Sequence, residues 1–401
     1  MPPGERENDT TLKNNTKSRK VKYYPPLDYL PTLFGVPFTI KNDTTQQGHE
    51  LESSATHTNL GNNYHCSSSY SSSGYWYEEV EHNGQSSFLS SDYKDKYAVF
   101  RNVVTDFHAD NTGQRDASLA IQKAIQAGST NGPGRGSHAM GTTGQPAIVY
   151  LPAGTYLLQA GLQFYVGTVL VGDATNPPVL KAITGFSGDH IIYAKDPNYV
   201  GTINFQIGVK NIVLDSTALD PSLHMTLLDW TVSQATQLSN VGFNMPMGVS
   251  NHAGLSTQYD YNSNLMINDL WFRGGAVGMR LSGQQWAFRN LRFTGTATGV
   301  IAGGTDIVFV DCHFEEGDIG IDASGTSGSL TVIDSTGRGL HSLIESVDSG
   351  NAGNAIILEN IQNTGDTVVL AGEAILRGAV SNTWVHGTMV NVTSFDSQTE
   401  N

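Results

Sequence analysis

The fold is decided by three four-residue segments spaced 21 residues apart, Asp269-Leu-Trp-Phe, Asn290-Leu-Arg-Phe and Asp311-Cys-His-Phe. Each begins with Asn or Asp, continues with an apolar residue and ends with Phe. The pattern also occurs upstream, at intervals of 29 residues, as Asn211-Ile-Val-Leu and Asn240-Val-Gly-Phe. Val332-Ile-Asp-Ser follows after another 21 residues, and Asn360-Ile-Gln-Asn is a weaker late copy. A repeat of this length is typical of a solenoid.

Each repeat accommodates about three short strands joined by tight corners. Asn and Asp suit the corner before a strand, because they tolerate the left-handed backbone conformation or bond to the local backbone. The apolar residues of successive turns then stack into one core. We therefore predict an all-β fold, a right-handed single-stranded parallel β-helix. The longer turns carry roughly eight extra residues each, which we expect to form loops on one face.

A helix is predicted at Ala117–Ala127, with Asp116 as its N-cap and an apolar stripe that includes Leu119. A solenoid needs a cap, so we expect this helix to cover the N-terminal end of the stack. Residues 1–72 are polar, interrupted by prolines and rich in serine, which predicts a disordered leader. Residues 73–401 are expected to form the β-helix domain.

The composition excludes several classes of protein. Charged residues make up 15 % of the 401 positions, and the formal net charge is −15. Nucleic acid is not an expected partner, because phosphate neutralisation requires clustered Lys and Arg. No membrane partner is expected, since no apolar run reaches the roughly 18 residues of a spanning helix. A neutral polysaccharide is compatible with this charge.

Short motifs for cofactors and metals are missing. The 12 His have no metal-ligand spacing, and G-x-S-x-G, H-E-x-x-H and phosphate-loop motifs are absent, so we expect no metal or cofactor. Absence of Asp-Asp and Gly-His-Gly disfavours the clustered-aspartate site of polygalacturonases. Cys66 and Cys312 allow one disulfide, and its formation stays open.

Several longer segments occur in a distinctive order: Tyr75-Trp-Tyr-Glu-Glu-Val-Glu-His-Asn-Gly, Phe100-Arg-Asn-Val, Val149-Tyr-Leu-Pro-Ala-Gly-Thr-Tyr, Val171-Gly-Asp-Ala-Thr-Asn-Pro-Pro, Gln234-Ala-Thr-Gln-Leu-Ser-Asn-Val and Gly283-Gln-Gln-Trp-Ala-Phe-Arg-Asn. This series resembles glycoside hydrolase family 55, the β-1,3-glucanases. The resemblance implies a secreted, laminarin-type hydrolase built from two tandem β-helices with the active cleft between them. This chain would be the first β-helix, and the second would be missing from it. The protein is therefore expected to be extracellular, although no signal peptide is visible at Met1.

The same resemblance implies residues of the site. Gln234 and Trp230 match a Trp-x-x-x-Gln-Ala-Thr segment of the family, while Gln284 and Gln285 match a Gln-Gln pair. Ser263 is what remains of a Gly-Ser-Gly-Gly loop at the cleft. Gln234 and Ser263 would position substrate and the attacking water. The catalytic acid is expected outside this chain.

Acidic residues give a second set of candidates. Glu315 and Glu316 lie in the densest acidic group of the repeats, together with Asp311 and Asp318. Crowding of like charges would raise the pKa of one carboxyl and make it a general acid of a glycosidase pair. The alternative is a solvated acidic corner.

Further residues are candidates for binding sugar. Asp229 precedes Trp230, whose indole is expected to be a sugar platform or a core residue. His252 and Tyr259 fall in expected cleft loops. Because neighbours on a strand face opposite ways, Trp286 is expected to share a face with Gln284, and at most one residue of the Gln-Gln pair is expected to face the cleft.

Three functions are therefore considered. The first is inverting hydrolysis of a neutral β-1,3-glucan, completed by a second β-helix. The second is a catalytically degenerate glucan-binding β-helix. The third is a polysaccharide lyase, which needs an anionic substrate, Ca²⁺ and a basic residue, and for which only Arg280, Arg289 and Arg292 lie near the repeats. The residues from Asn391 onward offer no cap, so the chain alone is expected to associate or to be marginally soluble.

Overall fold

The structure is a computed structural model, which describes residues 75–83, 97–128, 134–136, 146–257, 263–347 and 355–387. The predicted leader and Cys66 lie outside these ranges. The described helices are α1 (Trp76–Glu79), α3 (Ser118–Gln126) and the 3₁₀ turn η2 (Gly201–Ile203). The first described strands are β1 (Phe100–Asn102), β2 (Thr112–Asp116), β3 (Ala147–Leu151), β4 (Thr155–Gln163), β5 (Thr168–Gly172), β6 (Val179–Tyr193), β7 (Gly208–Asp215), β8 (Met225–Asp229), β9 (Gln237–Asn244), β10 (His252–Ser256) and β11 (Ser263–Arg273). The others are β12 (Val277–Leu281), β13 (Gln284–Thr294), β14 (Thr298–Val310), β15 (His313–Glu315), β16 (Ile319–Thr326), β17 (Ser329–Ile333), β18 (Thr336–Arg338), β19 (Ser342–Ser346), β20 (Ala355–Asn363), β21 (Asp366–Leu370), β22 (Glu373–Arg377) and β23 (Val380–Gly387).

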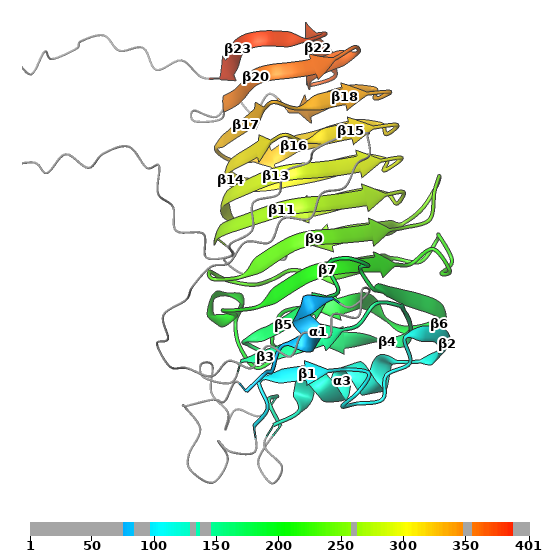
Figure 1. Ribbon diagram of the computed structural model, residues 1–401. Coiled ribbons are helices and arrows are strands. Elements are labelled where there is room, and N and C mark those ends of the chain that lie inside the picture. Colours follow the sequence, from blue (N-terminus) through cyan, green and yellow to red (C-terminus); the bar gives the residue numbers. More distant parts are fainter. Residues whose placement is uncertain are drawn as a thin grey trace, which may run out of the picture. The chain divides into compact units, whose positions relative to one another are not determined.

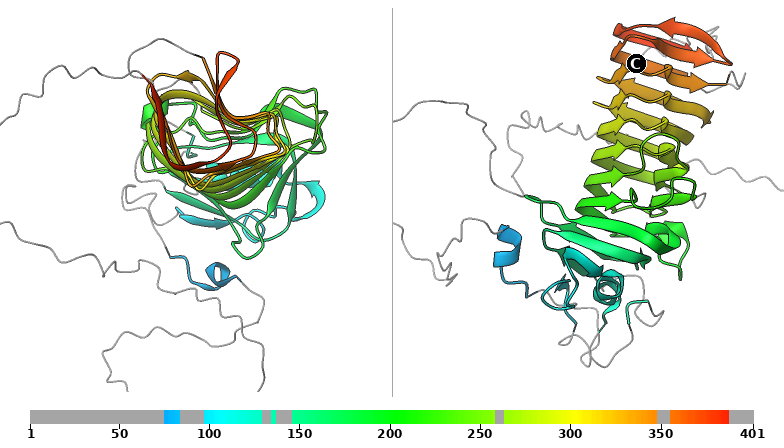
Figure 2. Two further views of the ribbon diagram at one scale, coloured as in Figure 1. Left: turned by 90° about the horizontal axis from the view of Figure 1, so that it is seen from above. Right: turned by 90° about the vertical axis from the view of Figure 1, so that its right-hand side faces the viewer.

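The strands stack as the rungs of a solenoid (Figure 1). One face runs through the parallel neighbours β7, β9, β11, β13, β14, β17 and β20. Another runs through β8, β10, β12, β14, β16, β19 and β21, and Figure 2 shows the rungs superimposed when seen from above. The predicted right-handed parallel β-helix is thus confirmed.

From β7 to β20, each rung of the solenoid contains a corner residue in the left-handed backbone conformation. The Asn or Asp that opens each repeated segment has a positive φ, between 50° and 59°, and the row comprises Asn211, Asn240, Asp269, Asn290, Asp311, Asp334 and Asn360. This confirms the role predicted for these residues, and it corrects one interval. The rung after Asp311 has its corner at Asp334, 23 residues on, so the repeat there is two residues longer than the sequence period.

The Phe of each segment points inward and stacks on the Phe of the next rung. Phe243, Phe272, Phe293 and Phe314 are buried, with ring centroids 4.5, 4.8 and 4.8 Å apart and planes within 7° of parallel. This spacing matches the roughly 4.8 Å between neighbouring strands. The ladder of rings therefore forms one continuous part of the core.

The helix α3 lies at the N-terminal end of the stack, as predicted (Figure 1). It is one residue shorter at each end than expected, and Leu119 is 65 % exposed, whereas Ile121, Ala124 and Ile125 are buried. Two buried guanidinium groups donate hydrogen bonds to carbonyl oxygens at its C-terminal end. Arg101 Nη1 donates to Ala124 O at 2.8 Å, and Arg135 Nη1 donates to Ile125 O at 2.8 Å. Cations at this end complement the helix dipole and fix the cap on the stack.

The C-terminal end of the described stack changes pattern. Strand β22 pairs antiparallel with β21, and β23 pairs antiparallel with β20. These two strands end the parallel progression, a feature that the repeat pattern does not predict. Residues from Asn391 onward lie outside the described ranges.

Candidate functional site

A groove of about 450 Å³ lies on the outer surface of β11, β13 and β14. Its lining includes Met266, Asn268, Arg289, Asp311 and Asp334. The register explains the hollow, because Ala287 lies between Met266 on one neighbouring strand and Val308 on the other. A small side chain between two larger ones leaves a depression in the sheet surface. We call this feature the outer groove.

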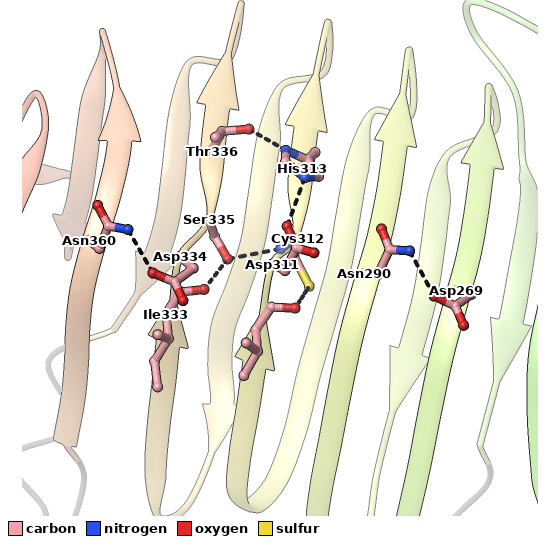
Figure 3. Close-up of polar contacts among 11 residues, drawn as sticks. Asp269, Asn290, Asp311, Cys312, His313, Ile333, Asp334, Ser335, Thr336 and Asn360 are labelled. Carbon is pink, nitrogen blue, oxygen red and sulfur yellow. Dashed lines mark hydrogen bonds and ion pairs between the residues drawn. The ribbon is translucent and has the colours of Figure 1, made fainter. Parts of the chain in front are cut away.

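Carboxylates of two successive corners border the outer groove, and hydrogen bonds hold each in place (Figure 3). His313 Nε2 lies 3.2 Å from Asp311 Oδ1, while its Nδ1 lies 2.8 Å from Thr336 Oγ1. Asn360 Nδ2 donates to Asp334 Oδ1 at 2.6 Å. Corners of successive rungs are about 4.8 Å apart. The groove thus offers fixed acceptors beside the exposed guanidinium donor of Arg289, a combination suited to hydroxyl groups.

The amino-terminal ends of the same strands carry a polar row. Ser263 of β11 is in register with Gln284 of β13, and Gln284 with Thr305 of β14. This brings two of the predicted site residues onto adjacent rungs. Gln234 precedes β9, is exposed and accepts a hydrogen bond from the Ser233 hydroxyl. We call the row Ser263, Gln284 and Thr305 the entry row.

The prediction that Trp286 shares a face with Gln284 was wrong. Gln284 and Gln285 are both exposed, and Trp286 is 1 % exposed. The reason is the backbone of Gln285, whose φ of 59° makes a second kind of corner and interrupts the alternation of a strand. Trp286 therefore stacks against Phe288 inside the solenoid, with centroids 5.7 Å apart, and offers no surface to a sugar.

Two more predicted sugar contacts are core residues. Trp230 is 1 % exposed, so its indole is not a platform. Asp229 is buried, and its Oδ1 accepts from the Thr231 hydroxyl at 2.6 Å and from the Thr231 N–H at 3.2 Å, which stabilises the turn after β8. The aromatic and acidic pair therefore serves packing and turn geometry.

His252 is likewise an interior residue and does not face a cleft. It is fully buried, with Nδ1 2.9 Å from Ser216 Oγ and Nε2 3.0 Å from the Asp220 carbonyl oxygen. Burial lowers the pKa of its imidazole from the ordinary value. The two contacts satisfy a neutral ring, one nitrogen donating and the other accepting.

The remaining candidates lie elsewhere on the repeat. Glu315 ends β15 and is half-buried, and Glu316 is exposed at the following corner. Neither lines the outer groove. The carboxylates of the groove are those of Asp311 and Asp334, which belong to the other corner of the repeat. Tyr259 falls outside the described residues. Cys312 is buried, its Sγ donates to Val310 O at 3.5 Å, and burial raises the pKa of its thiol to about 12.

Sequence reasoning did not select Met266, Asn268 or Asp334. Their place in the repeat was the available signal. Met266 and Asn268 are the two outward positions before a corner, and Asp334 is itself a corner residue. In the described ranges no group of three or more His, Cys, Asp and Glu is placed to hold a metal ion. A helix able to span a bilayer is likewise missing from the described part of the chain.

Comparison with known proteins now places the chain. Residues 100–322 match the family model described as rhamnogalacturonase A/epimerase, pectate lyase-like. The chain belongs to this family. A probable glucan endo-1,3-beta-glucosidase of Arthroderma benhamiae is 32 % identical over 336 residues, which is 79 % of this chain and 37 % of the relative. A glucan 1,3-beta-glucosidase of Cochliobolus carbonum is 29 % identical, over 78 % of this chain and 42 % of the relative.

The resemblance to β-1,3-glucanases is thereby confirmed at the level of sequence similarity. The chain spans about two fifths of the length of these curated relatives. Among solved structures, the catalytic unit of an α-1,3-glucanase from Streptomyces thermodiastaticus aligns with a TM-score of 0.46 and 17 % identity, covering 71 % of this chain and 57 % of that one.

Proposed function

We propose that this chain is the amino-terminal β-helix of a protein that hydrolyses β-1,3-glucan. The observation that carries the proposal is the similarity to two proteins named as 1,3-beta-glucosidases, which runs through nearly four fifths of the chain. The outer groove supports it, because a neutral polysaccharide needs hydroxyl-binding groups rather than a strongly basic surface. The net charge of −15 is compatible with such a substrate.

In this proposal the described β-helix binds and orients the glucan. Gln284 and Ser263 of the entry row and Gln234 beside it hold sugar hydroxyls and the attacking water. The acid that protonates the leaving glycosidic oxygen comes from the part of the relatives that this chain does not span. Water adds to the anomeric carbon from the opposite face as that C–O bond breaks, and a general base takes the proton of the water, so hydrolysis inverts configuration.

Binding without hydrolysis is the second candidate for the chain by itself. The observation that favours it is the span, because about three fifths of each relative has no counterpart here. A β-helix that keeps the groove and the entry row retains a glucan-binding surface even when no catalytic acid faces it.

The test combines retention on insoluble β-1,3-glucan with reducing-sugar release from laminarin. The chain alone should be retained and release no sugar, and release should begin when the carboxyl-terminal part of a relative is supplied. Gln284→Ala should weaken retention about threefold to tenfold, as expected for one lost hydrogen bond. Gln114→Ala, an exposed glutamine of β2, is the matched control and should change nothing. An unretained chain, or ultraviolet-absorbing unsaturated products, would contradict the proposal.

We further propose that the protein acts outside the cell, where structural and storage glucans are encountered. The proposal rests on the glucanase relatives. Fractionating a culture of the source organism and blotting the medium and the cell lysate with an antibody to this chain tests it. Detection only in the lysate would contradict it.

A further inference from the structure

A row of outward side chains runs along the solenoid. The corner row separates it from the outer groove. Trp271, Arg292, His313 and Thr336 occupy one register position of β11, β13, β15 and β18. Successive members are therefore about 4.8 Å apart along the solenoid axis. We call this row the outer strip. Of its four members, only Arg292 was considered from the sequence, as a basic residue for the lyase alternative.

The first member of the outer strip is a half-buried indole whose ring lies over the neighbouring strand. Trp271 is in register with Gly242 of β9, and a Cβ added to Gly242 would overlap atoms of the Trp271 ring. Glycine inside a strand is destabilising and marks a close approach of another group. Here the close approach is that of the indole. An indole held in this way and still partly exposed is a stacking surface for a pyranose ring.

The other members provide directed polar groups at the same repeat. Arg292 is exposed, and in the part of the chain that the structure describes no carboxylate lies within 4.0 Å of its guanidinium nitrogens. His313 is held at both ring nitrogens, by Asp311 and by Thr336 (Figure 3). Fixed polar groups lose little entropy when a ligand binds, which favours recognition of hydroxyl groups.

The surroundings favour a neutral ligand over an anionic one. The neighbouring corner row presents Asp269, Asn290 and Asp311, each two residues before a member of the outer strip. The next outward position of the same strands adds Arg273 and Glu315, one charge of each sign. Mixed charges give a polyanion no net attraction. The same carboxylate, amide and guanidinium groups still donate and accept hydrogen bonds to hydroxyls.

We propose that the outer strip is a carbohydrate-binding subsite that holds a stretch of β-1,3-glucan along the solenoid axis, outside the outer groove and the entry row. One sugar ring stacks on Trp271, and the sugars beyond it bond to the Arg292 guanidinium group and lie against the fixed ring of His313. The identity of the glucan rests on the proposed function. The position of the subsite rests on the register and on the Trp271–Gly242 contact.

The test measures binding of a soluble β-1,3-gluco-oligosaccharide by calorimetry to the wild-type chain and three variants. Trp271→Ala should weaken binding about tenfold, because it removes the stacking surface. Arg292→Ala should weaken it about threefold. Trp76→Ala removes a tryptophan that is 57 % exposed on α1, and it should leave affinity unchanged. A thermal melt of each variant establishes that it is folded.

Gly242→Ala is a second probe of the subsite that keeps the tryptophan. The added methyl group displaces the indole, so affinity should fall as it does in Trp271→Ala. If the wild-type chain binds and both variants bind equally well, the outer strip is not a subsite, although the proposed function stands. If the wild-type chain fails to bind the oligosaccharide, both proposals fail. Tighter binding of polygalacturonate than of the glucan would overturn the neutral ligand class.

Discussion

At the scale of single residues, Glu316 is conspicuous because of its backbone. It has a φ of 58° at a corner where the neighbouring rungs have Gly274, Gly295 and Gly339, with φ of 70°, 63° and 64°. A non-glycine residue with a Cβ is strained in this conformation by roughly 1–2 kcal/mol. Replacing Glu316 by glycine therefore tests whether the strain costs more than any interaction of the Glu316 carboxylate contributes.

Glu316→Gly should raise the free energy of unfolding by about 0.5–1 kcal/mol, since relief of strain exceeds the added entropy of the unfolded chain. Urea denaturation measures it. Glu315→Gly, one residue earlier in extended strand β15, is the matched control and should lower stability. Loss of stability in Glu316→Gly would show that its carboxylate makes an interaction worth more than the strain.

A second residue, His252, links stability to pH. Burial lowers the pKa of its imidazole in the folded protein, so below the ordinary value of 6.5 the unfolded chain takes up a proton that the folded chain does not. The free energy of unfolding should therefore fall as pH decreases from about 7 through 6.5, and level off below the lowered pKa. His252→Gln, which keeps a donor and an acceptor, should flatten this part of the stability profile. An unchanged profile would contradict the assignment.

At the scale of elements, the aromatic ladder contributes much of the cohesion between β9, β11, β13 and β15. Phe293 is stacked on both sides, by Phe272 and by Phe314. Phe293→Ala should lower the free energy of unfolding by about 3–5 kcal/mol, because it leaves a cavity with apolar walls on both neighbouring rungs. Phe293→Leu should cost less, since more of the volume is kept. Denaturant unfolding followed by circular dichroism checks both, and equal losses would argue against the stacking.

The corner row is a second element-scale feature, in which amide and carboxylate side chains bond from rung to rung. Asn360 donates to Asp334, and Asp311 occupies the rung before (Figure 3). Asn360→Asp should destabilise the fold by about 1–2 kcal/mol at pH 7, because it removes the donor and adds a third carboxylate. At acid pH the loss should shrink as the carboxylates gain protons.

Asn211→Asp is the matched control for this effect, because its neighbour in the row is Asn240 and its own amide donates to Gly172 O. It should lose a hydrogen bond without a pH-dependent charge penalty. A loss in Asn360→Asp that is the same at neutral and acid pH would exclude repulsion as the cause.

At the scale of the whole molecule, the described C-terminal end is the place where the chain is expected to associate. Strands β22 and β23 each pair with one neighbour in the described ranges, and Val385 of β23 is 61 % exposed. An unprotected strand edge is a template for another strand. Sedimentation velocity should show association that grows with concentration, and Val385→Lys should reduce it. A wild-type chain that sediments as a monomer at all concentrations would contradict this expectation.

Sequence alone was sufficient for the solenoid. The spaced Asn and Asp residues appeared as left-handed corners, and the Phe that ends four of the segments appeared as the inner ladder, because both features repeat along the chain. It was not sufficient for the site. Ser263 and Gln284 do lie on adjacent rungs, but Trp230, Trp286 and His252 are interior, although each was selected as a contact with substrate.

The physical reason for this limit is the corner itself. Sequence position assigns a side chain to the inner or outer face only while successive side chains alternate between the two faces. A residue in the left-handed conformation, such as Gln285, interrupts this alternation. The outer groove depends on Ala287 lying between longer side chains of two other rungs, and the outer strip depends on an indole that lies over Gly242. The sequence thus determined the repeat, the corners and the stacked core. Only the tertiary structure decided which side chains meet across rungs, because residues about 21 positions apart become neighbours only when the register is set.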